Sequence, residues 1–331
     1  MDEVTEDPSL PASRRRSWTS RVLRVSVALA ALCFVAYAVP LRDRCGPAGC
    51  APGLLTTLRS ASLPTLLALF AVYLSGTLVW AARWRALLGL AEVRLSLGEV
   101  WRVTLEAQAG GILLPGGVGG DALRVAYVKN RAPEAAVSKV IASTLADRVV
   151  GLSTLAGVAS AAALSFGAKG LGAYLPILVA IPVASVLGLL VLRQPRLAQA
   201  DFMSRGVGAR FVGPLLEYAV ARGGPRALLR GVLLSVIVSA VQLVVVRGIL
   251  AAIGAQPDRE AEVYVGTTLA MIVAALPALP GGWGTADAAY VFFLGSAGVP
   301  APAAVATCLI YRVFWYTTGI CGALAALSRR R

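Results

Sequence analysis

The stretch Leu114-Pro115-Gly116-Gly117-Val118-Gly119 decides how this chain folds, because it returns as Leu279-Pro280-Gly281-Gly282-Trp283-Gly284. The two copies begin 165 residues apart, which is half of the 331-residue chain. Each copy breaks an apolar stretch, 97–122 in the first half and 262–295 in the second, and proline and glycine are the residues that most readily end a helix. We therefore predict two re-entrant segments, which enter a bilayer and turn back instead of crossing it.

The chain that follows each motif is duplicated as well. Arg148 follows Pro115 by 33 residues and Arg312 follows Pro280 by 32, each within the next apolar block. A repeat of this length indicates two related halves. Since each half is predicted to cross the bilayer three times, the second half must run upside down, as an inverted repeat. The broken segments then enter from opposite sides, and we expect a polar site where they meet near the bilayer centre.

The composition indicates that lipid is the solvent for most of the chain. Hydrophobic residues make up 57% of the sequence and charged residues 15%, whereas about a quarter of a soluble domain is charged. The apolar residues form blocks long enough to cross about 30 Å of hydrocarbon as helices. We assign the net charge of +14 to membrane orientation and contact with anionic headgroups, and expect no nucleic acid partner.

We predict an all-α integral membrane protein with about six spanning helices plus the two re-entrant segments. The predicted spans are residues 22–40, 62–82, 140–166, 171–192, 229–253 and 303–327. Most of the 31 Lys and Arg residues lie in segments that a cytoplasmic N-terminus would place inside, so both termini are expected in the cytoplasm. Arg83, Trp84 and Arg85 end the second span in the manner of an interfacial anchor.

The predicted organisation has four parts. These are a basic cytoplasmic N-terminal tail (1–20), a first membrane repeat (21–166), a second membrane repeat (167–327) and a basic C-terminal tail (328–331). Within the second repeat, 193–228 is predicted to be a basic cytoplasmic connection that lies on an anionic leaflet or docks a partner. A cleaved signal peptide is the minor alternative for the first block.

The prolines and glycines of both motifs form a candidate anion site. Glycine lets backbone N–H groups approach an anion closely, and a helix that begins after the break directs its positive end toward that anion. The alternative is that Pro-Gly-Gly only permits close helix packing. The candidate residues are Pro115, Gly116, Gly117, Gly119, Pro280, Gly281, Gly282 and Gly284.

Arg148 and Arg312 are the strongest candidates for substrate binding, because a charge in the middle of a span is costly and usually faces a partner or a wet cavity. A guanidinium stays charged when buried and binds phosphate through two donors. The alternative is structural pairing, of Arg148 with Asp147 or Asp121 and of Arg312 with Asp287. Asp121 and Asp287 could also cap the helix after the break or bind a coupling proton.

The cysteines and the lack of histidine narrow the chemistry. Cys45 and Cys50 flank a Gly-Pro turn and could form a disulfide if their loop faces an oxidising compartment. Two free thiols are the alternative. The chain has no histidine, which excludes imidazole metal sites and His-dependent triads. Because we also find no Walker loop and no dinucleotide fingerprint, we expect no cofactor, no metal and no enzyme activity.

In their order and spacing, these motifs resemble the lysylphosphatidylglycerol synthase transmembrane-region family, also called the flippase-like domain family. The resemblance covers about residues 20 to 327 and rests on Arg83-Trp84-Arg85-Ala86-Leu87-Leu88, on Leu113 through Arg124, on Ala146-Asp147-Arg148, on Leu279 through Gly284, and on Arg312. It adds Arg124 to the candidate site and implies a bacterial cytoplasmic membrane. The family includes the membrane half of bacterial multiple-peptide-resistance proteins, to which movement of aminoacylated phosphatidylglycerol between leaflets is attributed. Since the sequence stops at Arg331, we expect no cytosolic aminoacyl-transferase domain and no lysine transfer from tRNA.

We therefore expect a lipid translocase that moves an anionic or phosphate-bearing headgroup through the central site, carrying an anionic phospholipid or a polyprenyl-phosphate-linked lipid. One alternative is a secondary transporter of a small soluble anion. The other is a non-transporting membrane scaffold for a lipid or glycan synthase. The sequence leaves a homo-oligomer and a partner synthase open as protein partners.

Overall fold

A computed structural model describes residues 26–27, 29–46, 49–113, 118–167, 170–192, 223–275 and 282–327. Over these residues the protein is helical apart from one small β-hairpin, so the predicted helical class is confirmed. Four of the described helices are long and apolar enough to cross a bilayer, which makes this a multi-pass membrane protein. They are α3 (Leu63–Leu88), α6 (Val137–Phe166), α11 (Gly224–Ala252) and α14 (Ala301–Leu327).

Helices also occupy the other two predicted spans, but they are shorter. One apolar helix covers Leu29–Ala38. The other is α7 (Leu175–Leu192), which carries Pro182 inside it and follows the 3-10 turn η3 (Gly172–Tyr174). Because a straight crossing takes about 20 residues, six crossings stay a prediction.

Each predicted broken segment is a pair of short helices. In the first half these are α4 (Leu97–Leu113) and α5 (Val118–Arg131), and in the second half α12 (Glu260–Ala274) and α13 (Thr285–Gly295). The longest of the four has 17 residues, about 26 Å of helix at 1.5 Å per residue, which is short of a full crossing. Helix α4 packs on α5 and α12 packs on α13, so each predicted segment contains two helices packed on each other. The predicted break residues themselves, 114–117 and 276–281, lie outside the described residues, and re-entry stays a prediction.

Small residues allow the two arms of each hairpin to pack closely. A Cβ on Gly120 of α5 would lie 2.5 Å from the backbone oxygen of Ala107 on α4. A Cβ on Gly266 of α12 would lie 2.7 Å from the backbone oxygen of Phe293 on α13. Neither approach leaves room for a side chain, so a glycine on one helix lets the other helix of each hairpin come near.

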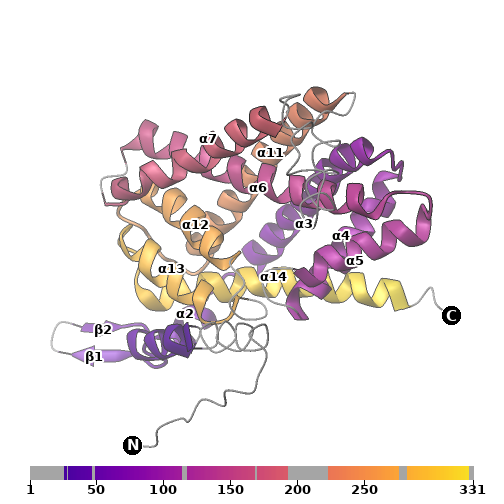
Figure 1. Ribbon diagram of the computed structural model, residues 1–331. Coiled ribbons are helices and arrows are strands. Elements are labelled where there is room, and N and C mark those ends of the chain that lie inside the picture. The colour runs from indigo at the N-terminus through magenta and orange to yellow at the C-terminus, as the bar shows by residue number, and fades with distance from the viewer. Residues whose placement is uncertain are drawn as a thin grey trace, which may run out of the picture.

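The order of elements is the same in both halves: a long helix, a hairpin and a second long helix. The two hairpins lie at opposite ends of the molecule, with the long helices between them (Figure 1). The halves are interleaved. The long helices α3 and α11 pack along each other, α14 packs on α4, and α6 packs on α12. The last helix of each half therefore covers the hairpin of the other half.

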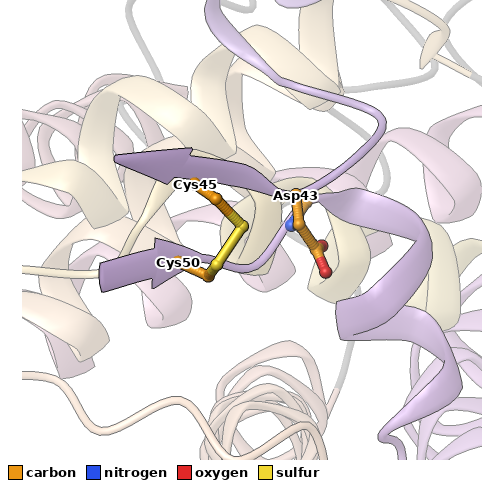
Figure 2. Close-up of a disulfide and its surroundings, with 4 residues drawn as sticks. Asp43, Cys45 and Cys50 are labelled. Carbon is orange, nitrogen blue, oxygen red and sulfur yellow. A yellow bond between two sulfur atoms is a disulfide. The ribbon is translucent and has the colours of Figure 1, made fainter. Parts of the chain in front are cut away.

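The loop before α3 contains a hairpin that the sequence did not predict. Strands β1 (Arg44–Gly46) and β2 (Gly49–Ala51) pair antiparallel, and α2 (Leu54–Arg59) follows them. Cys45 faces Cys50 across the strands and is joined to it by a disulfide (Figure 2). Beside it, the backbone N–H of Gly53 donates to Asp43 over 2.7 Å, which holds the pKa of that carboxyl below its usual range.

Several predicted regions lie outside the described residues. These are the N-terminal tail (1–20), the C-terminal tail (328–331) and the stretch 193–222 of the basic connection. Helix α11 begins at Gly224, inside the predicted connection, after Gly223 in a left-handed conformation, and the end of the connection at 228 stays a prediction. The division into two repeats at residue 166 stays a prediction.

Candidate functional site

Arg148 and Arg312 occupy equivalent positions in their helices. Arg148 lies eleven residues after Val137, where α6 begins, and Arg312 lies eleven residues after Ala301, where α14 begins. Eleven residues of α-helix are about 16 Å long, which is about half of the hydrocarbon thickness. If both helices cross the bilayer, both guanidinium groups lie near its middle.

Both arginines line one cavity of about 390 Å³ in the centre of the helices. Its wall includes residues of α3, α4, α5 and α6 from the first half and of α11, α12, α13 and α14 from the second. The charged residues in the wall are Arg83, Asp121, Arg124, Asp147, Arg148 and Arg312. The rest of the wall combines apolar and aromatic side chains, such as Leu155, Met271 and Trp315, with the uncharged polar residues Thr104, Gln108, Ser239 and Gln242. Among the described residues, the predicted site residues that line this cavity are Asp121, Arg124, Asp147, Arg148, Gly282 and Arg312, whereas Gly119, Gly284 and Asp287 do not line it.

Arg148 pairs with Asp121, the first acidic residue of α5. Its Nε donates to Oδ2 of Asp121 over 2.6 Å. Of the two partners predicted for Arg148, the structure selects Asp121, and Asp147 is bonded to other residues. The pair joins α5 of the hairpin to α6.

Arg312 makes the equivalent pair in the second half, with Asp287 on α13. Two guanidinium nitrogens of Arg312 donate to the two Asp287 oxygens over 3.0 and 3.1 Å. Asp287 also accepts from the backbone N–H of Gly284, which caps α13. The guanidinium carbon of Arg312 lies 4.1 Å from the centroid of the Trp283 ring, within the range of a cation–π contact. Asp287 therefore holds the arginine and caps the helix at once.

Asp147 is the centre of a third cluster, which the duplicated motifs do not contain. It accepts from Arg83 Nε over 2.7 Å, from Arg124 Nη1 over 3.2 Å and from the indole N–H of Trp80 over 3.0 Å. The guanidinium carbon of Arg124 lies over the rings of both Trp80 and Trp84, at 4.9 and 4.7 Å from their centroids. Two buried arginines therefore share one buried carboxylate.

The interfacial anchor predicted for Arg83 and Trp84 is wrong. Both side chains are buried, and Arg83 donates to Asp147 and to Ser235 of α11. A signal was available in the sequence. Arg83 and Trp84 follow Trp80 by three and four residues, which places all three on one face of a helix. Such a face offers a guanidinium and indole N–H groups as hydrogen-bond donors to a buried carboxylate.

The structure describes some of the prolines and glycines of the two motifs and not the others. Pro115, Gly116, Gly117, Pro280 and Gly281 lie outside the described residues. Gly119 is buried in the first turn of α5, and Gly282 lines the cavity with a positive φ of 67°. Gly284 has a φ of 76° and precedes α13.

The first turns of α5 and α13 already contain an acid, Asp121 and Asp287 respectively. A carboxylate at a helix N-terminus neutralises the positive end of that helix. The positive ends of these two helices are therefore occupied by the protein's own carboxylates, and the free positive charge of the cavity comes from arginine side chains. Among the residues that the structure describes, no cluster of three metal-ligating side chains occurs.

Comparison with protein families gives a match over most of the chain. The family model described as "Lysylphosphatidylglycerol synthase TM region" matches residues 51–322, which include both hairpins and the whole charged cavity. Comparison with curated proteins gave no match.

Proposed function

Because the chain belongs to the lysylphosphatidylglycerol synthase transmembrane-region family, we propose that it is a lipid translocase that moves an anionic or phosphate-bearing headgroup between leaflets. The headgroup enters the central cavity while its acyl or polyprenyl chains stay in the bilayer. The family places the protein in membrane-lipid biology. The proposal assigns the protein transport and no chemical step.

One observation carries the proposal: a cavity lined by arginines of both halves, with charged groups in a wall that is otherwise apolar, aromatic or uncharged polar. Arginine binds a phosphate through two parallel hydrogen bonds and stays charged when it is buried. Charged side chains within a membrane-spanning segment cost free energy to bury and usually mark a functional site. A phosphate headgroup fits the arginines, and the apolar and aromatic wall suits the first carbons of its chains.

The architecture supports access from both sides. We propose that the two halves are related as an inverted repeat, with α4–α5 entering from the cytoplasmic side and α12–α13 from the other. The hairpins lie at opposite ends of the molecule (Figure 1), and each is covered by a helix of the other half. Movement of one hairpin would open the cavity to one leaflet without opening it to the other.

The test is headgroup translocation in proteoliposomes. Vesicles would contain one labelled lipid at a time: anionic, aminoacylated, zwitterionic or polyprenyl-phosphate. Wild type is compared with Arg148→Ala and with Arg247→Ala as the matched control, because Arg247 pairs with Glu260 and does not line the cavity. We expect selective translocation by wild type and by the control, and loss of most of the rate in Arg148→Ala.

The alternatives predict other outcomes of the same experiment. A transporter of small soluble anions would take up phosphate or sulfate into the vesicles and move no lipid. A scaffold for a synthase would move neither, even when it is folded. Either result, from wild-type protein whose folding has been verified, contradicts the translocase proposal.

A further inference from the structure

The two equivalent ion pairs differ in the exposure of their side chains and in the number of their hydrogen bonds. Arg148 and Asp121 keep 36% and 27% of their side-chain exposure and share one hydrogen bond, whereas Arg312 and Asp287 keep 6% and 5% and share two. Trp283 also stacks on Arg312. The pair of the first half can therefore be reached from the cavity, and the pair of the second half is held from several sides.

The charges of the two halves differ as well. In the described part of the first half, Arg83, Arg124 and Arg148 face the cavity with only Asp121 and Asp147, which leaves one positive charge in excess. In the second half Arg312 and Asp287 cancel. The segments at the two breaks, 114–117 and 276–281, contain no charged residue. Since an uncompensated charge in a low-dielectric site is costly, a ligand with one negative charge is expected to bind in the first half.

Asp121 also has a second partner within reach. Arg124 lies one helical turn after Asp121 on α5 and lines the same cavity. It is hydrogen-bonded to Asp147 through Nη1, and its Nε is buried without a hydrogen-bond partner in the described structure. Among the described residues, Arg312 is the one arginine that forms an ion pair with Asp287, which also accepts from the backbone N–H of Gly284. Separating Asp121 from Arg148 is therefore expected to cost less free energy than separating Asp287 from Arg312.

We infer that Arg148 binds the ligand by partner exchange. A phosphate group with one negative charge takes the place of Asp121 on Arg148, and Asp121 turns to Arg124. The Arg312–Asp287 pair stays closed and positions α13 against α14. Asp121 is thus a competitor of the ligand and sets its affinity. This inference rests on the proposed function, because it names the residue and the charge of the group that the central site binds.

Two aspartate variants test the exchange directly. Asp121→Asn and Asp287→Asn each remove one negative charge from the same region, and they differ in which arginine is released. Purified protein in phosphatidylcholine nanodiscs would be titrated with short-chain phosphatidylglycerol, with inorganic phosphate as a second arm. Binding is followed by tryptophan fluorescence, since Trp80 and Trp315 line the cavity.

We expect Asp121→Asn to bind phosphatidylglycerol about tenfold more tightly than wild type, because the competing carboxylate is gone, and Arg148→Gln to bind at least about tenfold more weakly. Asp287→Asn is expected to lower thermal stability without tightening binding. Equal or weaker binding by Asp121→Asn overturns the exchange, and equal tightening by Asp287→Asn overturns the asymmetry. Should Asp287→Asn fail to fold, the opposite shifts expected of Asp121→Asn and Arg148→Gln still decide whether exchange occurs.

The two probes and the flux assay separate this inference from the proposed function. If the variants show this order of affinities for inorganic phosphate but not for phosphatidylglycerol, the site binds a soluble anion. That result supports the partner exchange and contradicts a lipid as the ligand. Tightening in Asp121→Asn together with absent lipid translocation by wild type contradicts the translocase and not the exchange. Lipid translocation by wild type without tightening in Asp121→Asn contradicts the exchange alone.

Discussion

At the scale of single residues, the stability of the site depends on one carboxylate. Asp147 is buried and neutralises two arginines that are buried as well. Its own desolvation is offset by three hydrogen bonds, from Arg83, Arg124 and Trp80. Removing one member of a buried ion pair leaves a charge without a partner, and that costs more than the pair itself contributes.

We therefore predict that Asp147→Asn destabilises the protein by about 3–5 kcal/mol. Arg83→Met should cost less, because Asp147 keeps Arg124 as a partner and the methionine fills part of the space. The measurement is thermal unfolding in detergent for both variants. A smaller loss in Asp147→Asn than in Arg83→Met would show that the shared carboxylate is not the centre of the cluster.

A second residue-scale prediction concerns Gly151 on α6. A Cβ at this position would lie 2.9 Å from Nη1 of Arg83, and Arg83 is fixed by Asp147 and Ser235. Gly151→Ala should therefore destabilise by about 1–3 kcal/mol through overpacking. Gly157→Ala on the same helix is the matched control. With nothing within 4 Å of its Cβ, it should be neutral or stabilising by up to about 1 kcal/mol. Similar unfolding temperatures for the two variants would contradict the close contact at Gly151.

At the scale of elements, the hairpins depend on contacts with distant helices. On α14, a Cβ at Gly322 would lie 2.5 Å from the backbone carbon of Leu105 on α4. We predict that Gly322→Ala separates these helices and lowers stability by about 1–3 kcal/mol, again measured by thermal unfolding. Gly188→Ala on α7, where nothing lies within 4 Å, is the control and should be neutral. If both variants unfold at the wild-type temperature, α14 does not hold α4.

The sequence predicted where helices are, and it could not predict which helix faces meet. Helix positions follow from the apolar blocks because a bilayer imposes a length on them, and the hairpins follow from Pro-Gly-Gly because that sequence interrupts a helix. From the sequence, either Asp121 or Asp147 could have paired with Arg148. The choice depends on the rotation of α6 against α5, which packing determines. For Arg83 the sequence does show a shared helix face with Trp80 and Trp84, but the helices that bury this face, α6 and α11, are brought there by packing.

Pattern methods also missed the β1–β2 hairpin, for a different reason. Each strand has three residues, too few for an alternating pattern to show. The spacing of Cys45 and Cys50 did raise the possibility of a bond, and the structure pairs them. The spacing alone does not give the register of the two strands, in which the two cysteines face each other directly.

At the scale of the whole molecule, the orientation in the membrane can be tested with this disulfide. If both termini are cytoplasmic, the loop with Cys45 and Cys50 lies on the opposite side. A thiol reagent that cannot cross membranes should then label intact cells only after a reductant has opened the bond. The Cys45→Ser/Cys50→Ser double variant is the control and should give no such signal. Labelling that requires disrupted membranes would show that the protein is oriented the other way.

The interleaved packing of the halves also has a consequence for synthesis of the protein. The last residue of α4 is Leu113, and α14, which covers α4, begins 188 residues later at Ala301. At about 5–20 residues per second, the ribosome takes roughly 10–40 s to make that interval. During this wait the first hairpin lacks its cover, and Arg148 stands in a half-built cavity. We therefore expect the first hairpin to complete its packing only after α14 has been made.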